Sequence, residues 1–377
     1  MTVRGTDFSL LAQFAALSDP RQMAKVLYPL PEILLLVLAA TLAGADDFVE
    51  TRAWGEERLG FLRRFLPYAN GIPSHDTLNH VVNALDPELF KRCFVAWVDT
   101  MRTDQPEFVA IDGKTSRRCH ARSKGREPLH LVSAWASRQR LVLGQEAVAG
   151  KSNEITAIPL LLERLELAGA LVTIDAIGCQ TRIAQAILAK QADYLLAVKS
   201  NWPSLLAEIA RYFQDAPASA FDRLETIDGD HGRIEIRRHV VSREVAWLTG
   251  DRRHPGEPRF PGLATVLMVE AEVERAGTTS IARRYYLSSA RLDAATFARA
   301  VRSHWGIENR LHWVLDVVFR DDLARLRTGH GPENMATVRH MAVNLIRDAP
   351  GKHSLKVRRK KAAWSNDYLE TLLRRTA

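Results

Sequence analysis

The spacing of hydrophobic positions changes where the chain passes residue 108. From about residue 8 to 103, apolar residues recur every three or four positions between prolines, which predicts helices. The uncharged run from Ile33 to Ala45 predicts a buried helix, because its 13 residues are too few to span a bilayer. Ser74 is the expected N-cap of a later helix. The layout around Ser74 resembles a helix-turn-helix, but a plain helical bundle is favoured because no Lys or Arg follows in that helix.

After residue 108, short apolar runs alternate with helical segments. Strands are predicted at 108–111, 171–174 and 194–198, with a hairpin formed by 129–136 and 140–148. Helices are predicted at 154–167, from 178 to 190 and after Pro203. This alternation predicts an α/β sheet with an antiparallel hairpin at one side.

Residues 216 to 290 break this alternation. Arg233, Glu235 and Arg237 alternate with isoleucines, and strand-like runs follow at 265–273 and 281–287, so a β-rich insertion is predicted. Helices from about Ala294 and at 332–348 then return to the main fold, and the basic residues after them predict a mobile tail. The expected parts are an N-terminal helical domain (1–104), the α/β core (105–215), the insertion (216–290), the final core helices (291–350) and a basic C-terminal tail (351–377).

The helix after the insertion has one apolar face. Four apolar residues, spaced by four, three and four positions, lie on one side of this helix and are predicted to face the core. They are Ile307, Leu311, Val314 and Val318. Glu308 lies beside this stripe among polar and aromatic neighbours. A carboxylate in such a place needs a partner, which has to come from another part of the chain.

Composition indicates an ordinary globular protein. The 377 residues are 46% hydrophobic, which is enough for a large core and two or three structural units. Lys and Arg number 52 against 44 Asp and Glu, and the resulting net charge of +8 is weak support for a polyanionic partner.

Cys93, Cys119 and Cys179 lack C-x-x-C spacing, so neither a disulfide framework nor a zinc site is expected, and a reducing cytoplasm fits. No secretory signal and no membrane association are expected.

Two predicted core strands end in the same dipeptide, Ile-Asp. Asp112 and Asp175 follow these strands, and functional groups gather outside strand ends in open α/β sheets. Two neighbouring carboxylates repel each other, so either one holds a proton or a cation lies between them. Glu308 would complete an all-oxygen site of the kind that Mg²⁺ or Mn²⁺ prefers. Each acid alone is more often a cap or a surface residue, and only the combined order of elements favours a site.

Four motifs accompany this order of elements: AIDGKT around Asp112, TIDAIGCQ around Asp175, DHGRIEIR in the insertion and HWGIENRLHWVLDVVFRDD around Glu308. With them, nearly the whole chain resembles the DDE transposases of bacterial insertion sequences, in particular the group that includes the H-repeat-associated proteins. The resemblance implies an RNase H-like core, which is a mixed sheet flanked by helices, with a β-rich insertion and an N-terminal helical domain. It also implies that Asp112, Asp175 and Glu308 are the catalytic triad and hold two divalent ions, Mg²⁺ or Mn²⁺.

The implied activity is DNA transposition, a form of DNA recombination. A homo-oligomer in the cytoplasm would cleave phosphodiester bonds at the element ends and transfer the strands to target DNA, with two metal ions at each site. Two alternatives stay open: an RNase H-like metal-dependent DNA nuclease without strand transfer, and an inactive DNA-binding relic. In related transposases the final helix also carries Tyr, Arg and Lys, whereas the corresponding positions here hold Val301, His304 and Leu315. The resemblance therefore does not carry over the phosphate contacts of those three residues.

Cationic and aromatic residues near the acids predict DNA contacts. Six cations and no acid occur between Lys114 and Arg126, in a loop expected directly after Asp112, where a backbone phosphate would lie; a solvated charged loop is the alternative. Arg233 and Arg237 share a strand face with Glu235 and either contact DNA or form an ion pair with it. The residues assigned to DNA are Lys114, Arg117, Arg118, Arg122, Lys199, Arg233, Arg237, His304 and Trp305.

Aromatic side chains close to the acids have alternative roles in the core. Trp305 lies on the same side of the helix as Glu308 and is suited to stack on an unpaired base, with core packing as the equal alternative. Trp202 follows the third strand and also fits either role. His304 and His312 flank Glu308 four residues away on each side, but zinc is not expected because compact H-E-x-x-H spacing is absent.

Overall fold

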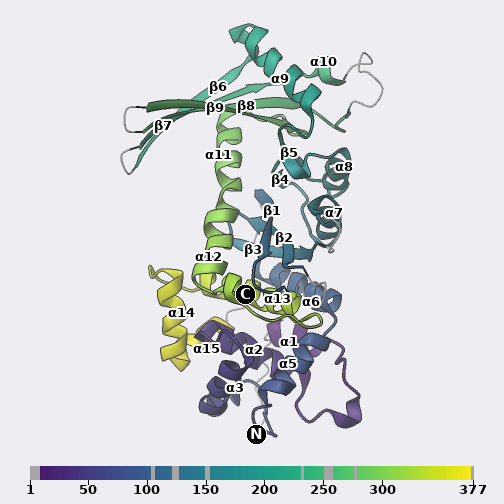
Figure 1. Ribbon diagram of the computed structural model, residues 1–377, viewed down its shortest axis with the longest axis vertical. Helices are drawn as coiled ribbons and strands as arrows, with labels where there is room; N and C mark the ends of the chain where they lie inside the picture. The colour runs from purple at the N-terminus through teal and green to yellow at the C-terminus, as the bar shows by residue number, and fades with distance from the viewer. Residues whose placement is uncertain are drawn as a thin grey trace.

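The computed structural model describes residues 9–102, 107–120, 127–148, 153–230, 233–249, 258–275 and 278–374. The molecule is elongated (Figure 1). A helical body lies at one end, an α/β core occupies the middle, and a β extension forms the other end. One long helix follows the extension and runs along the core back to the helical body, so it connects all three parts.

The helical body is built around one buried helix. Its first helices are α1 (Ser9–Ala15), α2 (Leu30–Ala43), α3 (Phe48–Glu57), α4 (Leu59–Leu62), α5 (His75–Ala84) and α6 (Pro87–Met101). Helix α2 is buried along its whole length, as its uninterrupted apolar sequence predicts. In the described part of the chain, no helix combines the length and apolar character that a membrane crossing would need. Ser74 caps α5 as predicted, because its side chain accepts a hydrogen bond of 3.2 Å from the Thr77 amide.

A nine-stranded sheet forms the centre of the fold, in the order β3-β2-β1-β4-β5-β9-β8-β7-β6. The core strands are β1 (Phe108–Ser116), β2 (Leu129–Ala136), β3 (Leu141–Ala147), β4 (Leu171–Ile174) and β5 (Asp193–Val198). Strands β1 to β3 are antiparallel, whereas β1, β4 and β5 are parallel. Helix α7 (Glu154–Arg164) connects β3 to β4 and α8 (Thr181–Ala189) connects β4 to β5, while α9 (Pro203–Asp215) follows β5 and leads to the insertion. The predicted fold class, an RNase H-like mixed sheet flanked by helices, is confirmed.

Strand β1 is longer than predicted. Its parallel pairing with β4 ends at Ile111 and Ile174, but its antiparallel pairing with β2 continues to Ser116. Asp112 is therefore inside a strand, at the point where the parallel pairing ends. The prediction that a loop follows directly after Asp112 is wrong, because β2 continues to satisfy the backbone of residues 112–116 after β4 has turned away.

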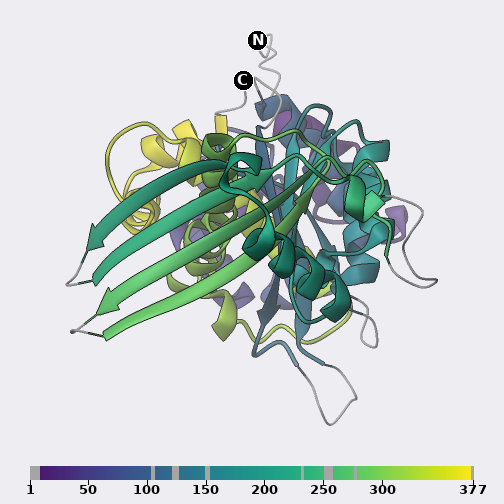
Figure 2. The same ribbon diagram turned by 90° about the horizontal axis from the view of Figure 1, so that it is seen from above.

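The insertion extends the core sheet. Its strands are β6 (Asp222–Asp230), β7 (Arg233–Ser242), β8 (Thr265–Arg275) and β9 (Thr278–Ser288), and all neighbours among them are antiparallel. Strand β9 also pairs with β5, so the insertion continues the sheet at the edge of the core. Figure 2 shows the four strands curving together beyond the core. Phe297 of the following helix is fully buried in the apolar cluster that joins the extension to the core.

The helix that carries Glu308 is continuous but changes its winding. Helix α11 (Ala294–His304) leads into a π-helical turn (Ile307–His312) and then into α12 (Trp313–Val317). The predicted apolar stripe is confirmed, because Ile307, Leu311, Val314 and Val318 are all buried. A π-helical turn inside an α-helix is rare and occurs frequently at functional sites.

The basic C-terminal segment is folded. Helix α13 (Gly331–Asp348) is followed by α14 (Leu355–Trp364) and α15 (Asn366–Arg374), which lie beside the N-terminal helices (Figure 1). The prediction of a mobile tail is therefore wrong for residues 355–374. The physical reason is that Leu369, Leu372 and Leu373 are buried and that one of the basic residues, Arg359, is buried as well.

Arg359 fastens α14 to the helical body, and its removal is expected to destabilise the protein. Its guanidinium donates to the carbonyls of Thr41 and Val318 and pairs with Asp46. Arg359→Ala would leave these buried acceptors without a donor, so we expect a loss of roughly 2–4 kcal/mol in the free energy of unfolding, measured by urea denaturation. The exposed neighbour provides the control: Lys360→Ala should change stability by less than about 0.5 kcal/mol. Equal effects of the two variants would show that α14 is not fastened through Arg359.

Candidate active site

The sheet register brings Asp112 and Asp175 to the same place. Ile111 of β1 pairs with Ile174 of β4, and each aspartate is the next residue of its strand. Asp175 leaves the sheet there and caps a short 3-10 turn, where its side chain accepts a hydrogen bond of 3.1 Å from the Ile177 amide. The sequence prediction that these two acids stand on neighbouring central strands is confirmed by the pairing.

Asp112 is surrounded by other carboxylates. Its pKa is raised to about 7, mainly by burial and in addition by the negative charges of Asp175, Glu154 and Glu308, whereas a hydrogen bond with the Gly113 backbone opposes the rise. The three predicted acids therefore interact electrostatically, although they come from two strands and a distant helix. Near neutral pH this group of acids cannot carry its full negative charge without a compensating cation.

Glu308 and His312 come from the π-helical turn beside β1. Glu308 is exposed, whereas His312 is largely buried, and its Nδ1 atom lies 3.6 Å from Oδ2 of Asp112. The pKa of His312 is lowered to about 4, mainly by burial and in addition by the positive charge of Lys114. The imidazole is therefore neutral at neutral pH and does not compensate the charge of Asp112.

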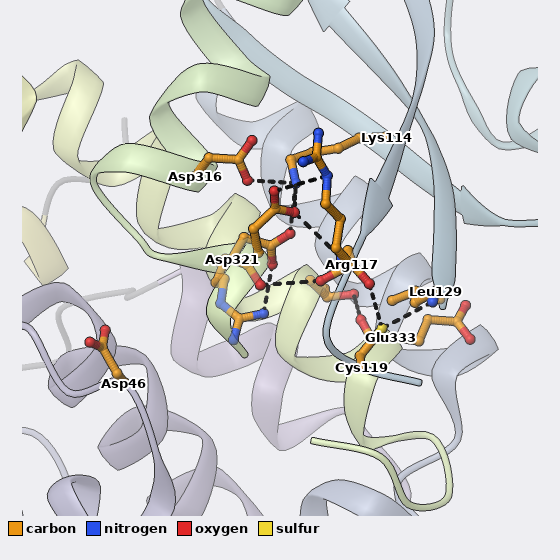
Figure 3. Close-up of polar contacts among 12 residues, drawn as sticks. Asp46, Lys114, Arg117, Cys119, Leu129, Asp316, Asp321 and Glu333 are labelled. Atoms are coloured by element: carbon orange, nitrogen blue, oxygen red, sulfur yellow. Dashed lines mark hydrogen bonds and ion pairs between the residues drawn. The ribbon is translucent and has the colours of Figure 1, made fainter. Parts of the chain in front are cut away.

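Two other acidic clusters in the described part of the chain differ from this group. Each brings three carboxylates within 4.8 Å of one another: Glu88, Glu146 and Glu333 in one, and Asp316, Asp321 and Asp322 in the other. A lysine ammonium lies inside each cluster. Lys91 is 2.6–3.0 Å from its three acids, and Lys114 is 2.7–3.3 Å from the acids of the second cluster (Figure 3). Both clusters thus already contain their cation.

The acids around Asp112 fit a divalent metal. Among the described residues, no Lys or Arg forms an ion pair with Asp112, Asp175 or Glu308; the only ion-pair partner there is the neutral His312. All three donors are carboxylate oxygens, which hard divalent cations prefer. Their ligand atoms do not all lie within 4.8 Å of one another, unlike those of the two lysine clusters. Asp112, Asp175 and Glu308 are the residues that would hold the metal.

The predicted DNA-binding residues near β1 have different surroundings. The side chain of Lys114 is only 10% exposed and is occupied by its three aspartates, so it has no free ammonium for a phosphate. Arg117 is 81% exposed, with a single ion pair of 3.4 Å to Asp322, and Arg118 is exposed. Arg122 lies outside the described residues. Of this group, Arg117 and Arg118 are the ones that present charge to the solvent.

The residues of the extension and of β5 that were predicted to bind DNA also differ in how accessible they are. Arg237 pairs with Asp228 at 3.1 Å and with Glu235 at 2.9 Å, as in the ion-pair alternative. The side chain of Arg233 lies outside the described part. Lys199 is exposed just after β5 and is close enough to His304 to lower the pKa of that imidazole, after the larger effect of burial.

The aromatic candidates have distinct positions. Trp305 is 41% exposed, and the guanidinium of Arg284 lies 5.2 Å from its ring, so this indole is open to a further stacking partner. His304 shares a hydrogen bond of 3.0 Å with the Thr173 hydroxyl of β4. Trp202 has a structural contact, because its indole NH donates to the Cys179 carbonyl at 2.6 Å.

Sequence reasoning missed one acid of the site, Glu154. This residue begins α7 directly after the N-cap Asn153, and a first-turn glutamate is ordinarily explained by the helix dipole alone. The available signal was the Asp-Gly pair at 112–113, since a glycine beside a site acid leaves room for the close approach of another group.

The mixed sheet with its β-rich insertion and returning helix is an RNase H-like core, the class of fold found in DDE-type domains. Residues 103–345 match the Transposase DDE domain family and residues 11–98 match the DDE_Tnp_1-associated family, so the chain belongs to the DDE transposase family. The resemblance inferred from the motifs is confirmed. Membership in this family implies dependence on a divalent metal.

Similar proteins extend over most of the chain. "Putative transposase YncI" of Escherichia coli O157:H7 is 39% identical, covering 97% of this chain and 94% of that protein. "H repeat-associated putative transposase YhhI" of Escherichia coli K12 is 36% identical, covering 97% of both. "Inactive transposase YbfQ" of the same strain is 38% identical over 74 residues, which is 20% of this chain and 88% of that protein. Among solved structures, the piggyBac transposase synaptic complex with hairpin DNA matches with a TM-score of 0.41 and 11% identity, over 97% of this chain and 79% of that one.

Removing the charge of Asp112 is expected to stabilise the metal-free protein. Its folded pKa of about 7 lies above the ordinary value of 3.8, so the folded state retains a proton that the unfolded state has released between about pH 4 and 7. Stability therefore falls as the pH rises through this window. With EDTA at pH 8, Asp112→Asn should raise the free energy of unfolding by roughly 1–3 kcal/mol, and the gain should vanish near pH 4. Asp76→Asn, whose side chain is 87% exposed, is the control and should show no such pH dependence.

Proposed function

We propose that the protein is a DNA transposase in which Asp112, Asp175 and Glu308 hold two Mg²⁺ or Mn²⁺ ions. It cleaves phosphodiester bonds at the ends of an insertion element and transfers the freed strands to target DNA. The observation that supports this most directly is a group of carboxylates around Asp112 that has no lysine or arginine partner among the described residues, whereas each of the two tight acidic clusters found there contains a lysine. This contrast favours a site for an external cation.

In the proposed mechanism, the ions supply the electrostatic stabilisation and the chain positions the carboxylates that would hold them. When bound, the ions stabilise the attacking and leaving oxygens of an in-line displacement at phosphorus. The paired strands fix the backbone positions of Asp112 and Asp175 relative to each other, and the buried stripe holds the helix that carries Glu308 against the core. Asp112 must release its proton before it can serve as a ligand, so ion binding becomes more favourable as the pH rises toward 7.

DNA binding is assigned to exposed residues around this site. Arg117 and Arg118 follow β1 and are suited to contact backbone phosphates. Lys199 is exposed just after β5, and Trp305 offers an exposed ring to an unpaired base. His304 is left out of the proposal because it is largely buried and bonds to Thr173. Arg122 and Arg233 remain assigned to DNA from the sequence. Lys114 and Arg237 are left out of the proposal because carboxylates already occupy them.

The partners follow from the reaction. Transfer of an element requires that both of its ends be processed together, so we propose a homo-oligomer that binds two terminal repeats and a target DNA. We also place the protein in the cytoplasm, where the DNA of a bacterial insertion element lies. Its three cysteines are free and buried, which suits a reducing compartment.

Loss of Asp112 is expected to abolish cleavage while DNA binding is retained. Supercoiled donor DNA that carries the element ends is incubated with Mg²⁺ and with either the wild-type protein or Asp112→Ala, and cleavage and strand-transfer products are separated on a gel. The wild type should give both products, whereas Asp112→Ala should lower cleavage by at least about 1,000-fold, because a carboxylate that would hold the metal is lost. A mobility-shift assay should show that the variant still binds the end DNA. Cleavage that survives the substitution would refute the proposed site.

The same assay separates the alternatives. A nuclease without strand transfer would cut donor DNA whether or not it carries the element ends, and it would give no joined product. An inactive relic would shift the DNA band without cutting it. A short part of the chain is similar to "Inactive transposase YbfQ", so the inactive alternative is included in the test.

The exposed arginines after β1 should determine part of the salt dependence of DNA binding. Because each phosphate contact releases counterions, Arg117→Ala with Arg118→Ala should lower the slope of log K against log salt by about 2. Fluorescence anisotropy with labelled end DNA at several salt concentrations measures this slope. Arg211→Ala, with a side chain that is 82% exposed on α9, is the matched control and should leave the slope unchanged. An unchanged slope in the double variant would remove both residues from the DNA interface.

A further inference from the structure

Glu154 reaches from α7 to the strand that carries Asp112. Its carboxyl group lies directly over the Cα atom of Gly113: a Cβ atom at this glycine would be 2.7 Å from the Glu154 carboxyl carbon and overlap Oε1. Residue 113 therefore has to be glycine for this approach. The carboxylate of Glu154 is thus placed beside the backbone of the residue that follows Asp112.

Two further side chains hold Glu154 in this position. Nε2 of His130 lies 2.8 Å from its Oε1 atom, and the other ring nitrogen of His130 lies 2.7 Å from the Thr115 hydroxyl. In the neutral ring, Nε2–H donates to Glu154 and Nδ1 accepts from Thr115. His130 and Thr115 stand opposite each other on β2 and β1, so the sheet itself supports this brace.

Glu154 is more than a helix-terminal charge. Its side chain is only 15% exposed, and among the described residues its ion-pair partner is an imidazole and not a lysine or an arginine. Its negative charge acts on Asp112 after that of Asp175 and before that of Glu308. A purely structural glutamate at the start of a helix has no need to be buried close to Asp112, because this adds to the repulsion that Asp112 already experiences from Asp175 and Glu308.

We propose that Glu154 is a fourth carboxylate ligand of the metal centre and that His130 and Thr115 are positioning residues that aim it at the ion bound by Asp112. The proposal rests on the function proposed above, because it assumes a divalent ion at Asp112. It extends the three-acid site by one ligand from α7, on the Gly113 side of Asp112. Glycine at 113 is then required by the metal site, since any side chain there would displace the fourth ligand.

The test measures ion binding directly, without DNA and without turnover. Mn²⁺ is titrated into the full-length protein by isothermal calorimetry, and the rise in melting temperature on adding Mn²⁺ is recorded in parallel. Glu154→Gln keeps the shape and the hydrogen-bonding capacity of the side chain but removes its charge, so we expect its affinity for Mn²⁺ to fall by about tenfold or more. Glu163→Gln is the matched control, because Glu163 is an exposed glutamate on the same helix and its loss should leave the affinity unchanged.

The outcomes distinguish this proposal from the proposed function. Loss of Mn²⁺ binding in Asp112→Asn with wild-type affinity in Glu154→Gln would overturn the fourth ligand and leave the function intact. Absence of Mn²⁺ binding in the wild type would overturn both. Because Glu154 adds repulsion in the metal-free state, Glu154→Gln should melt no lower than the wild type in EDTA; a lower melting temperature there would assign the residue a structural role and overturn the proposal.

The brace is tested by substitutions that keep or remove its hydrogen bond. His130→Gln retains a donor toward Glu154 and should keep Mn²⁺ affinity near the wild-type value, whereas His130→Ala should lower it by roughly tenfold. Gly113→Ala should lower it as well by displacing Glu154, even though no ligand is removed. Equal affinities of the two His130 variants, or wild-type affinity in Gly113→Ala, would show that Glu154 does not need to be held at this position.

Discussion

The ammonium group of Lys114 connects the strand that carries Asp112 to the helix that carries Glu308. Lys114 lies two residues after Asp112, and its partners Asp316, Asp321 and Asp322 follow the π-helical turn. Burial lowers the pKa of this lysine, but Asp321 and Asp316 outweigh that effect and hold the pKa above its ordinary value. Arg339 of α13 closes the cluster through Asp321 at 2.9 Å. The positions of the acids in the site therefore depend on an ion cluster next to it.

A second cluster has the same role between the core and the helical body. Lys91 of α6 and Arg164 of α7 together bind Glu88, Glu146 and Glu333, which come from α6, β3 and α13. In both clusters, buried acids are neutralised by cations of the chain itself, as the cost of burying charge requires. The acids around Asp112 are the exception, and their repulsion lowers the stability of the metal-free protein. An ion that bound only the folded state would restore that stability, so the proposed metal binding would be coupled to folding at this site.

The sequence predicted the parts of this arrangement that depend on local pattern. The apolar strands ending in Ile-Asp and the four-three-four stripe depend on periodicity, and the structure contains both. The partners of Lys114 could not be predicted, because they lie about 200 residues further along the chain and look like ordinary surface acids. For the same reason, a lysine next to a predicted site acid was assigned to DNA. The sequence predicts a mobile tail around Arg359 because the basic residues dominate its pattern, and the leucines that bury this segment come only later in the chain.

The two histidines that flank Glu308 explain how one helix reaches both strands. His304 bonds to Thr173 of β4, whereas His312, eight residues later, lies against Asp112 of β1. Burial lowers the pKa of both imidazoles, so they contact the strands as neutral groups and add no positive charge that would compete with a metal. Glu308 lies between them in the sequence, and the π-helical turn widens the helix there while Ile307 and Leu311 stay buried. The helix is thus fixed to β4 on one side and to β1 on the other, and Glu308 lies in the turn between these two contacts, close enough to Asp112 for its charge to raise the pKa of that aspartate.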